Sequence, residues 1–308
     1  MKIRIKPWQL AGAVILLCVS AVAVVRWVRV SQPYDASRML AALPFYRATL
    51  LYIDTGLLRK SGMLDLFAGS KAVEESDYLR FVEQTGFDYR TDLDAVAVGF
   101  VNGSVYLTLR GRFQWKQLSG YAEAQGGECH YSVCTMPGNS LERNISFFPL
   151  TTNVLALAVS PRPRAVVDIV PENPKLSAVM PAEPVWMSFP PSAFANLNTF
   201  PAGTRSFMSP LASARRVTFA AGPKGDRLEL RLEVECSSPA AAEDLARQLS
   251  GTTDLLKKMI QRDNLTPNPR DLSGVLVAGA FQQQQDLVIG SWPIERGFVE
   301  ALAAGQIQ

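Results

Sequence analysis

Residues 95–113 read AVAVGFVNGSVYLTLRGRF, two alternating runs on either side of Asn102-Gly103. Before this pair, valine and phenylalanine alternate with alanine and glycine. After it, valine and leucine alternate with tyrosine, threonine and arginine. Period-two patterning on both sides of Asn-Gly predicts a β-hairpin with one buried face. Because tight hairpins pair their strands antiparallel, the stretch indicates an antiparallel sheet.

A second stretch, RRVTFAAGPKGDRLELRLEVE (215–235), repeats this plan with a different turn. Its second arm alternates leucine or valine with charged residues, which predicts one buried and one solvated sheet face. Around both hairpins the sequence predicts the same order: a strand, a helix, the hairpin, a helix, a final strand pair and a helix. In the second copy GVLVAGAF and DLVIGSW supply that final pair. The predicted fold class is therefore α+β, with two related lobes, each an antiparallel sheet with helices packed on one face.

The matching elements lie roughly 120–135 residues apart, far beyond the roughly 20–50 residues of solenoid repeats. Four prolines between 171 and 184 cannot sustain a helix or central strand and are expected to separate the copies. The predicted organisation is a cytoplasmic tip and anchor (1–31), a connector (32–47), a first lobe (48–170), a Pro-rich linker (171–183) and a second lobe (184–308).

The copies differ most in three places, where we expect the functional residues to lie. These are 128–137, 189–211 and 252–271, the last of which contains TTDLLKKMIQRDN, a predicted separate helix.

An apolar run near the N-terminus predicts a transmembrane helix. Nineteen residues without a formal charge separate Lys6 from Arg26, close to the ~20 apolar residues that span a bilayer. Tryptophan favours the membrane interface, and charged residues mark the two ends of the apolar span. The residues assigned to the anchor by these criteria are Trp8, Arg26, Trp27 and Arg29.

The anchor sets the expected location. Lys2, Arg4 and Lys6 precede the run, which predicts a cytoplasmic N-terminus, a single crossing of the inner membrane and a body in the periplasm of a bacterium. The alternative is a signal peptide cleaved near Ala23, after the A-x-A pattern 21–23, which would release a secreted protein.

Charge argues against a nucleic-acid partner. The formal net charge is +3, but five of the 31 basic residues and none of the 28 acidic ones lie in the first 30 positions. The rest of the chain is close to neutral, whereas a nucleic-acid footprint needs a clustered basic face.

Cys129 and Cys134 bracket HYSV and are predicted to form a hairpin disulfide in an oxidising compartment. His130, the one histidine, lies between them, so three zinc ligands are close in sequence. No second histidine or paired CxxC completes a common zinc set, and we predict no metal site and no cofactor. Cys18 lies in the apolar run, and Cys236 is left over.

The sequence contains no nucleophile elbow, no S-x-x-K pair, no Walker loop and no dinucleotide fingerprint. Asp88, Asp92 and Asp94 lie close together but lack the glycine and glutamate of a calcium loop, and we interpret them as a solvated turn. We therefore predict no catalytic residues and a non-enzymatic protein. A hydrolase with an unrecognised site is the least favoured alternative.

Residues 189–211, FPPSAFANLNTFPAGTRSFMSPL, are rich in proline, phenylalanine and serine. They predict a mobile flap, a partner-binding loop or an irregular connection over the sheet. Because aromatic residues are enriched at interfaces, the candidate partner contacts are Phe194, Phe200, Phe207 and Met208.

The stretch AALPFYRATLLYIDTGLL (41–58) resembles the opening of a broad group of uncharacterised bacterial single-pass envelope proteins with repeated α+β exterior domains. The resemblance implies an envelope location and no particular activity. Our favoured expectation is a scaffold that holds a protein partner, or another copy, near the membrane. The alternative is a protein that binds a ligand in the cleft between the lobes.

Overall fold

The computed structural model describes residues 34–303, except 45, 65–75, 139, 141, 171–179, 196–203, 225–226, 264–265 and 269. From Ala36 onward the chain forms one compact unit. The predicted anchor, with Trp8, Arg26, Trp27 and Arg29, lies outside the described residues, as does Phe200. Among the helices within those residues, none has the length and apolar character to cross a membrane.

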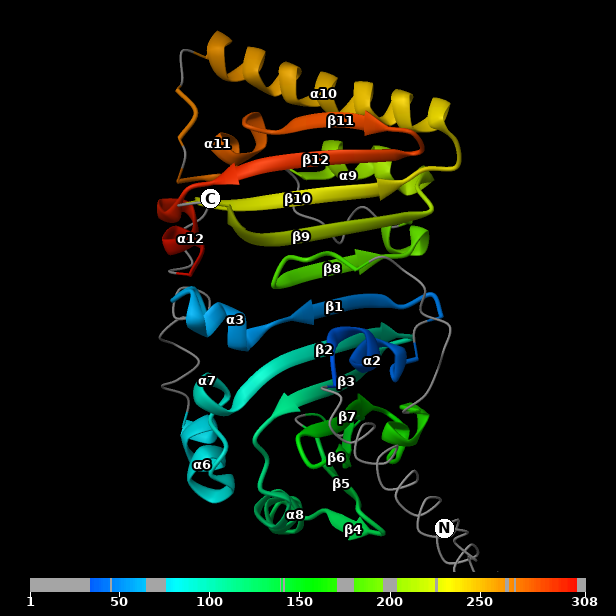
Figure 1. Ribbon diagram of the computed structural model, residues 1–308, viewed down its shortest axis with the longest axis vertical. Helices are drawn as coiled ribbons and strands as arrows, with labels where there is room; N and C mark the ends of the chain where they lie inside the picture. Colours follow the sequence, from blue (N-terminus) through cyan, green and yellow to red (C-terminus); the bar gives the residue numbers. More distant parts are fainter. Residues whose placement is uncertain are drawn as a thin grey trace, which may run out of the picture. The chain divides into compact units, whose positions relative to one another are not determined.

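In the described part of the chain, twelve antiparallel strands form a single sheet, in the order β11-β12-β10-β9-β8-β1-β2-β3-β7-β6-β5-β4 (Figure 1). The strands are β1 (Thr49–Ile53), β2 (Leu93–Val101), β3 (Ser104–Gly111), β4 (Glu128–His130), β5 (Val133–Pro137), β6 (Asn144–Thr151), β7 (Val154–Ser160), β8 (Val185–Phe189), β9 (Arg216–Lys224), β10 (Arg227–Glu235), β11 (Ala280–Gln284) and β12 (Leu287–Ile294). The predicted α+β class and antiparallel pairing are confirmed.

Helices connect these strands. The α-helices are α2 (Ala36–Ala41), α3 (Thr55–Lys60), α6 (Ser76–Thr85), α7 (Tyr89–Asp92), α8 (Trp115–Ala124), α9 (Arg205–Met208), α10 (Pro239–Arg262), α11 (Leu272–Val277) and α12 (Arg296–Ala303). Within the described residues, the short 3-10 helices are η1 (Ala165–Asp168), η2 (Pro191–Phe194) and η5 (Ser209–Ser213).

The internal repeat is visible in the strand order. The first half runs β1-β2-β3-β7-β6 and the second half runs β8-β9-β10-β12-β11, so each half lays out its strands in the same sequence. The first half adds the small hairpin β4–β5 beyond β6. The predicted hairpins are β2–β3 and β9–β10, and Asn102 and Gly103 both adopt the positive φ that a type I′ turn requires.

The halves share one sheet because β1 pairs antiparallel with β8. In this seam Tyr52 lies opposite Trp186 and Leu50 lies opposite Ser188. The rings of Tyr52 and Trp186 stack with their centroids 5.8 Å apart. The expected cleft between separate lobes is therefore replaced by a continuous hydrogen-bonded surface.

The sheet has two different faces. We call the side that carries Leu232 and Val234 the helix face, because the core of the second half lies there against α10 and α11. In the first half Phe147 and Leu155 occupy the same face and pack with α8. The opposite side is called the open face.

On the open face the two halves differ. In the first half α2 contacts β2 and β3, and η1 contacts β6 and β7. Thr108 donates a hydrogen bond to the Met39 carbonyl, and the Val166 N–H donates to Ser146. Helices on a single face were expected, and this is wrong for the first half, whose small residues on β2 and β7 allow helices to approach closely. In the second half no described helix covers the open face.

Candidate functional site

The predicted aromatic contacts are largely interior. Phe194 is 2% exposed and Phe207 is 4% exposed, and both belong to the core of the second half. Met208 is half-buried and packs against that core. The expectation that Phe194 and Phe207 are surface contacts is wrong, because η2 and α9, which carry these rings, pack against the core on the helix face.

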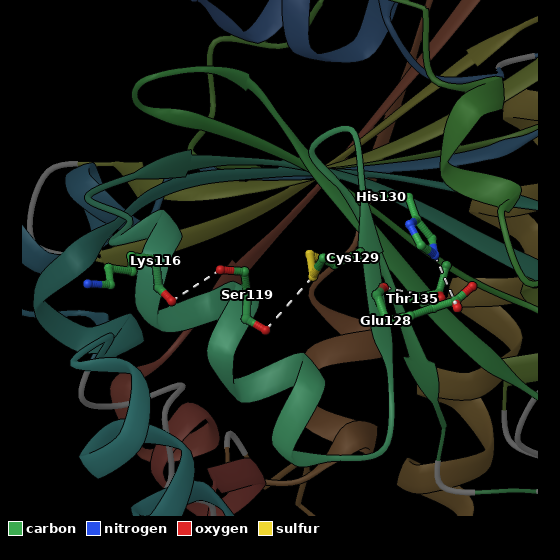
Figure 2. Close-up of a disulfide and its surroundings, with 7 residues drawn as sticks. Lys116, Ser119, Glu128, Cys129, His130 and Thr135 are labelled. Carbon is green, nitrogen blue, oxygen red and sulfur yellow. Dashed lines mark hydrogen bonds and ion pairs between the residues drawn. A yellow bond between two sulfur atoms is a disulfide. The ribbon is translucent and has the colours of Figure 1, made fainter.

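The two cysteines of the small hairpin are bonded. Cys129 and Cys134 lie directly opposite each other on β4 and β5 and form a disulfide. Figure 2 shows Ser119 of α8 facing Cys129, whose Sγ lies 3.8 Å from the Ser119 carbonyl oxygen. The disulfide therefore fixes the hairpin where it packs on α8, which is a structural role.

The turn between these cysteines is strained. Tyr131 and Ser132 have φ values of 49° and 70°, a region that asparagine and glycine occupy far more readily. We expect the double substitution Tyr131→Asn and Ser132→Gly to raise the free energy of unfolding by about 1–2 kcal/mol. Urea denaturation with the disulfide intact measures this change. A loss of stability would contradict the interpretation.

The control for that variant lies in the turn between β6 and β7. Thr152 does not have a positive φ, so Thr152→Gly relieves no strain there. This substitution should instead destabilise by roughly 0.4–1 kcal/mol, because glycine increases the entropy of the unfolded chain.

His130 lies on the exposed hairpin, and its Nε2 is 3.2 Å from Glu128 Oε2. Within the part of the chain that the structure describes, no group of three or more histidine, cysteine, aspartate or glutamate side chains is arranged to hold a metal ion. Cys236 is buried, and burial raises the pKa of its thiol, which disfavours the reactive thiolate.

The three clustered aspartates have structural partners. Asp88 caps α7, and its N–H donates to Asp92, 2.9 Å away. Burial raises the pKa of Asp92, but hydrogen bonds from the Asp88 N–H and from Arg112 outweigh it, so the pKa lies below its usual value. Asp94 lies 3.7 Å from Arg59. These interactions hold the chain at the start of β2.

A pocket that the sequence did not reveal lies on the open face over the seam. We call this space of about 200 Å³ the junction pocket. Its floor crosses four strands, with Leu50 from β1, Trp186 from β8, Ala220 from β9 and Arg231 from β10. Residues 180–183, the end of the predicted linker, form one wall.

The pairing of β8, β9 and β10 determines which of their polar residues line the junction pocket. Alternate residues of a strand point to the same face, so the charged residues that alternate with the leucines of β10 all point toward the pocket side. Ser188 lies opposite Thr218, and Thr218 lies opposite Glu233, which makes one row across three strands. Arg216 lies opposite Glu235 in the adjacent row.

The wall lies close to the floor because β9 carries a glycine there. A Cβ added to Gly222 would lie 3.0 Å from Pro184 Cδ and 3.3 Å from Glu183 Cβ. Any larger residue would push this segment away from the sheet. Gly222 therefore allows Glu183 to reach the pocket.

The charged lining residues fall into two groups. Arg231 lies 3.8 Å from Glu183 and 3.5 Å from Glu233, so these three form one network. Arg216 instead donates to the Ser188 hydroxyl over 3.2 Å, and no carboxylate in the described ranges forms an ion pair with it. The pocket thus combines paired charges, an available guanidinium, the hydroxyls of buried Ser188 and half-buried Thr218, and an aromatic floor.

The fold and the pocket together define an α+β protein with a duplicated antiparallel sheet and a polar pocket over the seam. No family model and no curated protein matches the chain. Three crystal forms of TP0453 are similar in structure. Form I has a TM-score of 0.48 and 10% identity over 86% of this chain and 95% of that one.

The values for the other two forms are similar. Form IV has a TM-score of 0.45 and 13% identity over 87% of this chain and 95% of that one. Form III has a TM-score of 0.44 and 10% identity over 86% of this chain and 96% of that one. At these values the likeness carries no argument about activity.

Proposed function

We propose that this is a non-catalytic binding protein of the bacterial envelope whose ligand binds in the junction pocket. In this proposal the N-terminal segment anchors the chain in the inner membrane and the body lies in the periplasm. The observation that carries the proposal is the position of the pocket. It lies over the seam between the halves, next to the part of the open face in the second half that no described helix covers.

The difference between the halves supports this assignment. On the open face β2 presents small residues, among them Ala97 and Gly99, whereas β9 presents Arg216 and Thr218. Both halves reach the same strand order, so the polar set of the second half is not needed to form the sheet. This polar set is therefore available to recognise a ligand.

Binding of a protein partner or a second copy is the second candidate. The observation that favours it is the edge strand β11, whose Gln282, Gln283 and Gln284 are all exposed. Extended segments bind such edges by adding a strand. Partner binding through Phe194 and Phe207 is no longer part of the proposal, because both rings are buried.

Thermal denaturation of the full-length protein in detergent, with a library of small metabolites and lipids, tests the first candidate. A ligand at 100 times its Kd should stabilise the native state by about 2.7 kcal/mol. Ala220→Leu fills the floor of the pocket and should abolish the shift in Tm. Ser291 of β12 also lies on the open face but outside the pocket, so Ser291→Leu should retain the shift in Tm. A shift that persists in Ala220→Leu, or an empty screen, would exclude the pocket as the ligand site.

A further inference from the structure

We propose that the junction pocket binds a small zwitterion of the amino-acid type, with its carboxylate against Arg216 and its ammonium group against Glu235. This inference rests on the proposed function, because it names the ligand class for the same pocket. It follows from the charges that remain after the internal pairs are accounted for.

Arg216 supplies the anion-binding end. A guanidinium has five N–H donors in a planar fork that matches a carboxylate. Here the described partner of that fork is one hydroxyl, the Oγ of Ser188, at 3.2 Å. The half-buried position of Arg216 strengthens its attraction for an anion, since the screening by water is reduced.

Ser188 adds a second donor at the same end. Its side chain is buried, and its oxygen accepts from Arg216 and also from Thr218, at 3.1 Å. With its oxygen accepting twice, the Ser188 O–H is left to donate, and no acceptor for it is present in the described part of the chain. A ligand carboxylate oxygen would satisfy both Arg216 and Ser188.

Glu235 supplies the cation-binding end. It lies directly opposite Arg216 on β10, a position in which Cβ atoms are about 4.5–5.5 Å apart. The Arg216 guanidinium nevertheless bonds to Ser188, on the strand on its other side. The two opposite charges therefore lie near each other without forming an ion pair, which complements a ligand with an ammonium group and a carboxylate on neighbouring atoms.

The other charged residues disfavour a simple anion. Arg231 is engaged by Glu183 and Glu233, and this network carries one excess negative charge. A plain anion at Arg216 would face that network and Glu235, whereas a plain cation at Glu235 would leave the Arg216 guanidinium without a carboxylate. A zwitterion satisfies both ends, so the lining discriminates by repulsion as well as by attraction.

Size agrees with this class. The pocket volume of about 200 Å³ is smaller than the roughly 300–1,000 Å³ of pockets for drug-sized ligands. Leu50 and Trp186 on the floor offer apolar contact for a ligand side chain. We therefore expect a preference for amino acids with an apolar side chain.

Isothermal titration of the full-length protein in detergent with each of the twenty L-amino acids tests the inference. At least one free amino acid should bind, and its methyl ester and its N-acetyl derivative should each bind at least about 10-fold more weakly, because each removes one charge. Arg216→Met should weaken binding by at least the same factor. Arg227 is a basic residue on the same face but outside the pocket lining, so Arg227→Met should leave the affinity unchanged.

Glu235→Gln gives the sharper readout. It should weaken the binding of the free amino acid and leave the binding of the N-acetyl derivative unchanged. The affinities of the variant for the two ligands should therefore converge. If the ester and the N-acetyl form bind as well as the free amino acid, the zwitterion assignment is overturned.

Binding of amino acids and binding of other compounds can be measured separately. If no amino acid binds but another compound gives a shift in Tm that Ala220→Leu removes, the zwitterion assignment fails and the pocket remains a ligand site. If no compound of any class binds, both fail.

Discussion

Replacement of Phe194 by alanine is expected to lower the free energy of unfolding by about 3–5 kcal/mol. The ring is 2% exposed, and its centroid lies 5.7 Å from that of Phe189. Removal of the ring leaves a cavity that the surrounding sheet and helices can fill only in part. Denaturant titration followed by circular dichroism measures the loss.

The control for Phe194→Ala is Leu255→Ala on α10, where the side chain is 59% exposed. That change should alter stability by less than about 0.5 kcal/mol. A loss below about 1 kcal/mol in Phe194→Ala would contradict the core position. The same reasoning means that a partner lost from a Phe194 variant would report unfolding rather than a missing contact.

Trp186→Ala is expected to have an equally large effect and to change how the protein unfolds. Trp186 is 4% exposed and stacks on Tyr52 across the seam, so its removal weakens the strand pair that joins the halves. We expect a loss of about 3–5 kcal/mol, with the single transition separating into two. Differential scanning calorimetry detects this separation as a second peak.

Trp292→Ala is the matched control, because this tryptophan is equally buried but lies in the core of the second half. It should reduce stability by a similar amount without disturbing the seam. If Trp186→Ala and Trp292→Ala give the same number of transitions, the seam does not couple the halves.

Local patterns predicted the hairpins because the information for a hairpin is local. Alternation on both sides of Asn102-Gly103 and along 227–235 is enough to define β2–β3 and β9–β10. The pairing of β1 with β8 brings together residues more than a hundred positions apart in the chain. Nothing in either strand alone specifies that partner, so the sequence suggested two lobes where the structure has one sheet.

Short apolar runs were ambiguous. GVLVAGAF was predicted as a strand, but Leu272–Val277 forms α11, and β11 begins only at Ala280. Asp271 caps this helix by accepting from the Gly274 N–H at 3.1 Å. A run of this length fits a buried strand and a buried helix equally well, so only the cap distinguishes them.

The predicted helix at 252–264 belongs to a longer one. It continues α10, whose 24 residues run from Pro239 to Arg262 without interruption at Gly251. Glycine in a helix interior costs only about 1 kcal/mol, which the packing of the buried face offsets.

The candidate site was missed for a related reason. Function was expected in the segments that differ between the copies, yet the junction pocket is built mainly from strands that the copies share. Alternating charge in β10 did predict a wet face, but the row from Ser188 through Thr218 to Glu233 exists only through the register of three strands. Register over such separations cannot be read from composition or periodicity.

The pairing of β1 with β8 also suggests how the chain arose. Two equivalent edge strands that meet antiparallel form the isologous contact of a symmetric homodimer, in which each subunit offers the same edge to the other. A gene duplication followed by fusion converts that dimer into one polypeptide. The two copies can then diverge in sequence. One copy could then keep its covering helices while the other lost them and acquired a charged surface. A protein with a single repeat and this strand order should accordingly be a dimer.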